Sequence, residues 1–453
     1  MKPLTRRAFM RISAGSVAVG ATSKIKLLEP AALWGAGRAV APSDRVRFAS
    51  IGTGTRGCEL LDASLAVPGA ECVAVCDLYD SRHEAAQEAV RKQVPATRNY
   101  KEILDRKDVD AVIVAVPDHQ HRRVVVDACA AGKDVYCEKP MSHTVEDGFA
   151  MVDAARKGNR IVQIGSQRVS SIVYEKAREL YSSGALGEVF LIEGSSNRNS
   201  PSGAWVYPIP PDASEQTIDW NAFLAGAPQR PFDAARFFRW RCFADYGEGL
   251  AGDLFVHLLS GIHFIAGIDE VPQRAQTTGG LFRWKDGRDF PDVIETVYDY
   301  PSFRVSLYCN LNNSNQGGEP IKFQGTKGTM EILNQTLTFT QQDITPKPET
   351  YSTKGWPARL RNAYLAKWAA EKPQPAPLEY QAAVQSEIFT APAGYSDVPA
   401  HQANFFNAVR TRKATVENEV FGNHTAIGCH LANYAYFNKT IATWDGNAKA
   451  IRG

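Results

Sequence analysis

Residues 45–66 read RVRFASIGTGTRGCELLDASLA. The first seven residues predict a β-strand, the glycines Gly52, Gly54 and Gly57 predict a loop, and the residues that follow are compatible with a helix. In this order the glycines allow the backbone to turn tightly and to come close to a pyrophosphate. The N-terminus of the following helix then presents unpaired N–H groups to the pyrophosphate. The pattern predicts a dinucleotide-binding loop that includes Thr55 and Arg56, although ordinary turns also show this glycine spacing.

The next predicted strand, residues 71–76 (ECVAVC), ends at Asp77, about twenty residues beyond the glycines. A carboxylate at this place can accept hydrogen bonds from both ribose hydroxyls and repels a 2′-phosphate. We therefore expect NAD rather than NADP. Two alternatives remain open: the side chain of Arg82 would accommodate a phosphate, and Asp77 would cap the following helix instead.

A parallel sheet is predicted for the first part of the chain. Further apolar strands are expected at residues 111–116, 134–137 and 160–164, with helices at 122–131 and 145–155 between them. Apolar strands that alternate with helices are typical of a sheet covered on both faces. We place a Rossmann-type, doubly wound domain at residues 44–166.

Beyond Gln167 the predicted strands follow one another without intervening helices. They are expected at residues 188–194, 273–282, 293–300, 303–311 and 331–337. This predicts a large, open, mostly antiparallel sheet in a second domain over residues 167–453, so the fold class is α/β plus α+β. Residues 341–399, rich in Pro, Gln and Ala, predict an insertion or long excursion, and residues 401–453 predict closing helices.

The first 43 residues contain the segment TRRAFMR at positions 5–11, followed by the apolar run ISAGSVAVGA at 12–21. The run is shorter than the roughly 20 residues that a membrane span needs. The segment predicts export to the periplasm through the twin-arginine machinery, which carries folded proteins, so a cofactor bound in the cytoplasm can travel inside its pocket. The alternative is a frayed helix that happens to contain two arginines.

Composition argues against nucleic acid as a partner, because the net charge is only +2 and no basic run is interleaved with aromatic residues. The eight cysteines include no CxxC pair, and most fall inside predicted strands and helices. They are interpreted as small buried residues rather than as a disulfide set.

Two motifs carry candidate chemistry. Glu138, Lys139 and Pro140 follow the strand at 134–137, and ligands of such sheets bind beyond the carboxyl ends of the strands. Asp253 and His257 are four residues apart in a predicted helix, so both side chains project from one face. For Lys139 the alternative is a structural ion pair with Glu138 or another neighbour. For Asp253 and His257 the alternative is a surface ion pair or a metal site. We expect no metal.

Together these motifs resemble the glucose-fructose oxidoreductase, inositol dehydrogenase and MocA family of sugar oxidoreductases, over nearly all of the chain after Asp44. The motifs that carry the resemblance are Gly52/Gly54/Gly57, Asp77, Pro117 with His121, Glu138-Lys139-Pro140, and Asp253 with His257.

The resemblance implies roles for these residues. Lys139 would touch the nicotinamide ribose and the reacting hydroxyl, and the peptide before Pro140 is frequently cis. His257 would accept the hydroxyl proton, with Asp253 holding substrate hydroxyls, and the loop from Pro117 to His121 would pack near the cofactor. The chain departs from the family at Ser260, where an aspartate is common. The outer face of the second sheet would build a homo-oligomer.

Sugars are bound by planar polar groups and by aromatic faces. The substrate-binding candidates are Gln167, Arg168, Tyr174, Asn197 and Arg241, with Arg198, Trp205, Tyr207, Arg236 and Trp240 also considered. As a set they favour a sugar, polyol or glycoside over an apolar substrate.

The sequence therefore predicts an exported oxidoreductase that transfers hydride between a sugar hydroxyl carbon and a tightly bound NAD. One alternative is an epimerase or glycosidase that forms a keto-sugar transiently and recycles NAD internally. The presence of Lys139 argues against the glycosidase, because glycosidase relatives tend to lack this lysine. A second alternative is a non-catalytic sugar-binding protein, which the intact pair of Lys139 and His257 opposes.

Overall fold

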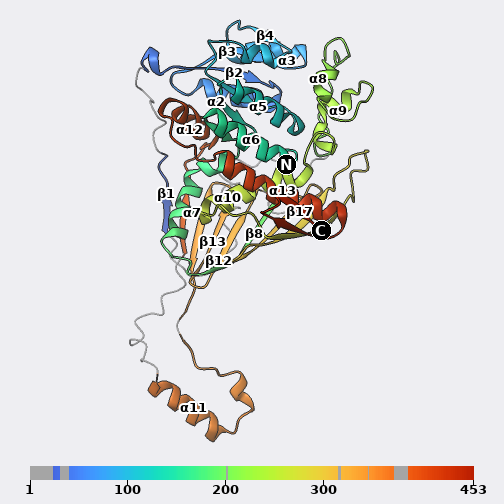
Figure 1. Cartoon of the computed structure of the whole chain (residues 1–453). Helices are drawn as coiled ribbons and strands as arrows, with labels where there is room; N and C mark the ends of the chain where they lie inside the picture. The colour runs from blue at the N-terminus through green and yellow to red at the C-terminus, as the bar shows by residue number, and fades with distance from the viewer. Residues whose placement is uncertain (1–23, 31–39, 200–202, 315–317, 345, 372–385) are drawn as a thin grey trace, which may run out of the picture.

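The computed structural model describes residues 24–30, 40–199, 203–314, 318–344, 346–371 and 386–453. The predicted export segment, residues 1–43, lies largely outside these ranges. Two β-sheets organise the described part of the chain, and helices lie between them (Figure 1).

The first sheet has six strands in the order β4-β3-β2-β5-β6-β7. Its strands are β2 (Val46–Ile51), β3 (Ala70–Cys76), β4 (Ala96–Thr97), β5 (Ala111–Val114), β6 (Asp134–Cys137) and β7 (Val162–Ile164). Every neighbouring pair is parallel. The predicted doubly wound parallel sheet is confirmed.

Helices cover both faces of this sheet. One face carries α2 (Thr55–Leu65) and α3 (Asp80–Val90), and the other carries α4 (Tyr100–Leu104), α5 (His121–Ala130) and α6 (Val145–Gly158). Along β5, Ala111 and Ile113 pack with the first group, whereas Val112 and Val114 pack with the second. Successive side chains of a strand point to opposite faces, so an uninterrupted apolar run fits a strand buried on both sides.

The second sheet has eleven strands in the order β1-β15-β14-β13-β12-β8-β11-β10-β9-β16-β17. They are β1 (Lys24–Leu27), β8 (Val189–Asn197), β9 (Arg274–Gly280), β10 (Val293–Asp299), β11 (Arg304–Asn310), β12 (Ile321–Gly325), β13 (Gly328–Leu333), β14 (Thr336–Gln341), β15 (Ser386–Thr390), β16 (Ile441–Asp445) and β17 (Ala450–Arg452). Only β1–β15 and β8–β11 pair in parallel, so the predicted mostly antiparallel sheet is confirmed.

The main core lies between this sheet and three helices, α7 (Ile172–Ser182), α10 (Val256–Ala266) and α13 (Glu419–Asn438). Helix α13 also contacts α6 of the first domain. The two domains are thus joined by packing as well as by the chain. Among the described residues no helix is both long and apolar enough to span a bilayer.

The C-terminal region differs in part from the expectation. The stretch 341–399 contains α11 (Ala358–Glu371), which projects away from the body of the molecule (Figure 1), but it also contains β15, a strand of the second sheet. The expected closing helices are α12 (Val398–Thr411) and α13, and the chain then forms β16 and β17. These last strands extend the second sheet, because β16 pairs with β9 and β17 pairs with β16.

Residues 203–248, here called the crossing segment, return from the second domain to the first. They contain α8 (Trp220–Leu224) and α9 (Ala234–Phe238), which lie beside the end of the first sheet in Figure 1. Backbone hydrogen bonds join Asp219 to Leu78 and Asp80 to Thr217 across the domains. An aromatic cluster seals this contact, made of Tyr79, Trp220, Phe223, Phe237, Phe238 and Tyr246.

Candidate active site

A cavity of about 630 Å³ lies between the two domains, at the carboxyl ends of the parallel strands. Of the ten residues predicted to bind the cofactor, nine line it: Gly52, Gly54, Thr55, Arg56, Gly57, Asp77, Pro117, Glu138 and Lys139. The crossing segment contributes Phe223, Phe237, Phe238 and Trp240 to the opposite side. This cavity is here called the main cavity.

The glycine loop needs its glycines. Gly52 has a φ of +87°, and a Cβ atom there would lie 2.5 Å from the carbonyl oxygen of Ala115. A Cβ atom at Gly57 would lie 2.1 Å from the carbonyl oxygen of Gly52. The loop therefore packs backbone against backbone at the start of α2, which leaves the N–H groups of this helix end facing the cavity.

Asp77 is fixed beside the glycine loop. Its Oδ2 accepts a hydrogen bond from the Thr53 amide at 2.7 Å, and its Oδ1 accepts from the Tyr79 amide at 3.0 Å. The alternative that Asp77 caps the next helix is wrong, because α3 begins at Asp80 and its N-cap residue is Tyr79.

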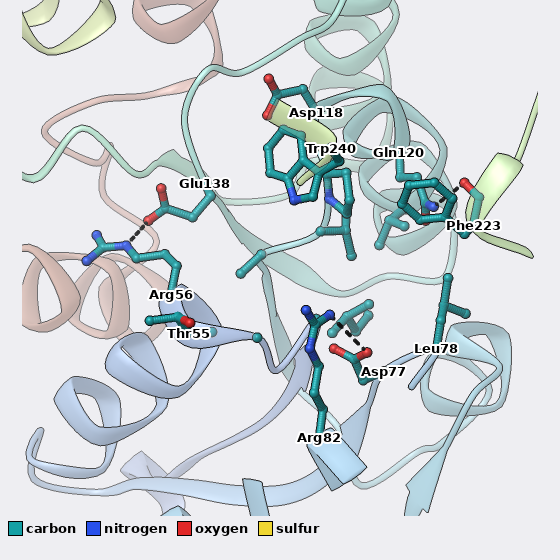
Figure 2. Close-up of a pocket in the computed structure, with 18 of the residues that line it drawn as sticks. Thr55, Arg56, Asp77, Leu78, Arg82, Asp118, Gln120, Glu138, Phe223 and Trp240 are labelled. Atoms are coloured by element: carbon teal, nitrogen blue, oxygen red, sulfur yellow. Dashed lines mark hydrogen bonds and ion pairs between the residues drawn. The ribbon is translucent and has the colours of Figure 1, made fainter. Parts of the chain in front are cut away.

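Arg82 faces Asp77 from α3, with 3.4 Å between Nη1 and Oδ1 (Figure 2). Its guanidinium carbon lies 5.2 Å from the ring centre of Phe237 and 5.4 Å from that of Phe238. It also lies 3.3 Å from where a Cβ atom of Gly54 would be. The crossing segment thus holds this cation over the glycine loop.

Glu138 is paired with Arg56 rather than with Lys139. The Nε atom of Arg56 donates to Oε1 of Glu138 at 2.8 Å (Figure 2). Burial lowers the pKa of Arg56, but the charges of Glu138 and Tyr136, with hydrogen bonds to Glu138 and Glu59, together outweigh burial and the net shift is upward. The suggested ion pair of Lys139 with Glu138 is therefore not formed.

Lys139 instead reaches Asp253 of the second domain. Its Nζ donates to both the carboxylate Oδ1 and the backbone oxygen of Asp253, each at 2.9 Å. The Lys139–Pro140 peptide is cis, as the family resemblance suggested. The lysine is thus held at the junction of the two domains and lines the main cavity.

His121 does not line the main cavity. It is fully buried, with Nδ1 2.9 Å from the carbonyl oxygen of Pro140 and Nε2 3.0 Å from that of Val116. The structure therefore places it behind the turn that carries Lys139, and we assign it a role in positioning this turn rather than in touching the cofactor.

Asp253 lies in a π-helical turn, Ala251–Phe255, which leads directly into α10. Besides Lys139, its carboxylate accepts hydrogen bonds from Nε of Arg241 at 3.2 Å and from Nε1 of Trp205 at 3.1 Å. Burial alone would raise the pKa of Asp253, but Lys139 and Arg241 lower it well below its usual range. Asp253 is therefore an ionised anchor for both cations.

His257 follows in the first turn of α10 and lines the main cavity. It is only 8% exposed, and its Nδ1 is buried without a hydrogen-bond partner among the described residues. Burial is the main cause that lowers the pKa of His257, and the positive charges of Lys139 and Arg168 lower it further, to well below its ordinary value of 6.5. Its imidazole is neutral at neutral pH and can accept a proton.

The predicted substrate-binding residues divide between two cavities. Gln167 and Arg241 line the main cavity. A second cavity of about 320 Å³, here called the side chamber, is lined by Gln167, Arg168, Ser171, Tyr174, Asn197, Arg198, Gly318, Glu319, Asn334, Gln335 and Asp397. Arg168, Tyr174 and Asn197 therefore lie beyond the main cavity, in a region that adjoins it through Gln167 and Arg198.

Asp118 was missed by sequence reasoning as a site residue. It lines the main cavity, and its Oδ2 accepts a hydrogen bond from the Glu248 amide at 3.1 Å. Burial raises the pKa of Asp118 well above its ordinary value. Its position directly after Pro117 was the available signal. No group of three or more His, Cys, Asp and Glu in the described ranges could hold a metal ion.

The model of an oxidoreductase family with an NAD-binding Rossmann fold matches residues 46–166. An uncharacterized oxidoreductase of Streptococcus pneumoniae is 32% identical over 293 residues, which are 63% of this chain and 68% of that relative. The chain belongs to the glucose-fructose oxidoreductase, inositol dehydrogenase and MocA family. Other relatives of this family match over less of their length. The inositol 2-dehydrogenase of Salmonella typhimurium is 34% identical over 129 residues, which are 28% of this chain and 38% of the relative.

Solved structures share the family fold over most of this chain. Levoglucosan dehydrogenase in complex with NADH and levoglucosan aligns with a TM-score of 0.63 at 17% identity, over 88% of this chain and 99% of the other. An aldose-aldose oxidoreductase from Caulobacter crescentus aligns with a TM-score of 0.62 over the same shares, also at 17% identity. At this identity the likeness shows the fold.

The first domain of this family member fits its cofactor, NAD. Gly52 and Gly57 leave no room for a Cβ atom, which lets the loop turn tightly beside the main cavity, and Asp77 stands directly after β3, where a carboxylate that binds the ribose is needed.

Proposed function

We propose that this protein is an exported oxidoreductase that transfers hydride between a hydroxyl-bearing carbon of a sugar, polyol or glycoside and a tightly held NAD. The main support is that Lys139, Asp253 and His257 line the same cavity as the glycine loop and Asp77. A cation, an ionised carboxylate and a neutral imidazole thus face one space beside a dinucleotide site.

The residues divide the work of proton transfer. Asp253 holds Lys139 and Arg241 in place and leaves their remaining N–H groups to orient substrate hydroxyls. His257 accepts the hydroxyl proton at Nε2, since its Nδ1 is the buried nitrogen. NAD held by the glycine loop and Asp77 would supply the hydride acceptor for the same carbon, which would become a carbonyl, and a second carbonyl-bearing sugar would be the acceptor that regenerates the oxidised cofactor.

The crossing segment supports tight retention of the cofactor. Its aromatic residues line the main cavity opposite the glycine loop and contact Tyr79 of the first domain. A dinucleotide in this cavity would be covered by both domains, so its release would require the crossing segment to move.

The experiment has two steps. Purified protein is denatured and its small molecules are identified by mass spectrometry, with about one NAD per chain expected from a tightly bound single site. Native protein is then followed by the near-ultraviolet absorbance of reduced nicotinamide while sugars and glycosides are added one at a time. An empty protein that also fails to use added NAD with any sugar would refute the proposal.

The same experiment separates the redox cycle from the internal, net non-redox cycle. Reduction by one sugar and reoxidation by another supports the two-substrate cycle. Conversion of a single substrate to an epimer or to cleavage products, without accumulation of reduced cofactor, supports the alternative. Lys139 favours the first, because it is present and held in the cavity.

Export and assembly complete the proposal. The segment TRRAFMR at residues 5–11 supports transport through the twin-arginine machinery to the periplasm. Replacing both Arg6 and Arg7 by Lys should leave the protein in the cytoplasmic fraction, and periplasmic recovery of this variant would contradict export by this route. The second sheet has exposed residues that alternate with its core residues and lie on the face opposite α10, including Glu193 of β8 and Glu295 of β10, and we propose that this face forms a homo-oligomer.

A further inference from the structure

We propose that the side chamber binds the second unit of a two-unit glycoside whose first unit reacts in the main cavity. The inference rests on the proposed function and specifies its substrate class. Because both cavities are lined by Gln167 and Arg198, one ligand can extend from the first into the second.

The side chamber contains none of the groups assigned to proton or hydride transfer. Lys139, Asp253 and His257 line the main cavity and do not line the side chamber. A substrate unit bound in the side chamber would therefore be a unit that does not itself react. Its volume of about 320 Å³ is half that of the main cavity and lies within the ~300–1,000 Å³ range of ligand sites.

The walls of the side chamber suit a hydroxyl-rich ligand. Tyr174 is 3% exposed, and its hydroxyl interacts with the side chain of Arg168. Three buried atoms of the lining have no hydrogen-bond partner among the described residues: Nε of Arg168, Oδ1 of Asn197 and Oε1 of Gln335. Buried polar atoms are nearly always hydrogen-bonded, and ring hydroxyls both donate and accept, so a sugar unit satisfies this mixture.

The charge of the side chamber favours a neutral unit. Glu319 is ion-paired with both arginines, with Arg168 and, at 3.0 Å, with Nη2 of Arg198. Asp397 adds a second carboxylate to the lining. Two arginines are thus balanced by two carboxylates, which leaves no free cation for a phosphate or uronate. A neutral glycosyl unit is expected instead.

Binding in the side chamber should raise the rate of reaction at the first unit. Contacts to a remote part of a substrate can be used to orient its reacting part, so that truncated substrates lose kcat as well as affinity. Disaccharides should therefore be better substrates than the monosaccharides that they contain.

The test follows the reduction of bound nicotinamide with cellobiose, maltose and trehalose, against glucose and glucose 6-phosphate. We expect at least one disaccharide to exceed glucose by more than about tenfold in kcat/KM, the effect of one or two well-made contacts. The Gln335→Leu variant, which removes an unpartnered amide at similar size, should lower this ratio by about tenfold. Gln341→Leu, an exposed change on the same hairpin, should leave the ratio as it is.

The outcomes separate the two proposals. Equal or better turnover of glucose, preference for glucose 6-phosphate, or an unchanged ratio in Gln335→Leu overturns the side-chamber inference while hydride transfer stands. Failure of every sugar to reduce the cofactor overturns the proposed function itself. If Gln335→Leu does not fold, Tyr174→Phe, which removes only the hydroxyl, gives the same comparison.

Discussion

Asp253 connects the site residues of the two domains. Its carboxylate accepts hydrogen bonds from Lys139, which follows β6, and from Arg241 and Trp205 of the crossing segment. Since the lowered pKa of Asp253 keeps it ionised, the two cations stay paired while the imidazole of His257 stays neutral. The same nearby positive charges keep the carboxylate of Asp253 ionised and, together with burial, keep the imidazole of His257 unprotonated.

Replacing Lys139 by Ala should leave NAD bound and reduce turnover by about 10²–10⁴-fold, the usual contribution of a group that assists proton transfer. Asp253 would keep Arg241 and Trp205 as partners, so the fold should persist. Sugar-dependent reduction and NAD content measure the two effects. The control is Lys157→Ala, an exposed lysine of α6. Unchanged turnover in Lys139→Ala would contradict the mechanism.

The pH dependence of hydroxyl oxidation should show the lowered pKa of His257. The pKa of His257 in the folded protein lies below its ordinary value of 6.5, so the imidazole is still neutral at pH 6.5. It becomes protonated, and stops acting as a base, only at a lower pH. The acid limb of kcat/KM should therefore fall below pH 6.5. His257→Asn should remove this limb together with most of the activity, whereas a limb at or above pH 6.5 would refute the assignment.

The π-helical turn at Ala251–Phe255 is the element that places Asp253. The sequence predicted a regular helix, in which residues four apart share a face. The structure has a wider turn before α10, yet Asp253 and His257 still line one cavity. Such single π turns are common at functional sites.

Gly252 makes this turn possible, because a Cβ atom there would lie 2.1 Å from Cβ of Glu248 and 3.2 Å from Cγ of Pro140. Gly252→Ala should displace Asp253 from Lys139 and lower kcat at least tenfold while NAD remains bound, since small displacements at a reacting centre are costly. Steady-state kinetics and NAD content test this. Gly355→Ala, at a glycine with open space around it, is the matched control. Equal kcat in the two variants would show that the turn tolerates a side chain.

Over the whole molecule, the two domains enclose the main cavity because the crossing segment packs back on the first domain. Phe237 is central to this contact, with Tyr79 and Phe238 as ring neighbours and Arg82 against its face. The enclosure of the main cavity therefore depends on a segment remote from the glycine loop in the sequence.

Phe237→Ala should destabilise the protein by about 3–5 kcal/mol, the usual cost of truncating a buried phenylalanine, and should increase the loss of NAD during dialysis. Thermal unfolding and NAD content after dialysis measure these effects. Phe282→Ala removes a ring that is 68% exposed and should change neither. Full NAD retention in a destabilised Phe237→Ala variant would show that the crossing segment does not hold the cofactor.

The sequence by itself determined the parallel sheet, the glycine loop, Asp77 and the motif of Lys139, because each depends on residues close together in the chain. Gly52 and Gly57 are required by local backbone contacts, and apolar runs such as β5 are recognisable from neighbouring residues alone.

Only the tertiary structure decided how separate segments meet. It showed that Lys139 pairs with Asp253 rather than Glu138, that His121 lies behind the Lys139 turn, and that Tyr174 lines a second cavity. It also revealed the crossing segment and the pairing of β16 with β9. These contacts join residues far apart in the sequence, and short-range periodicity carries no information about which distant surfaces pack together.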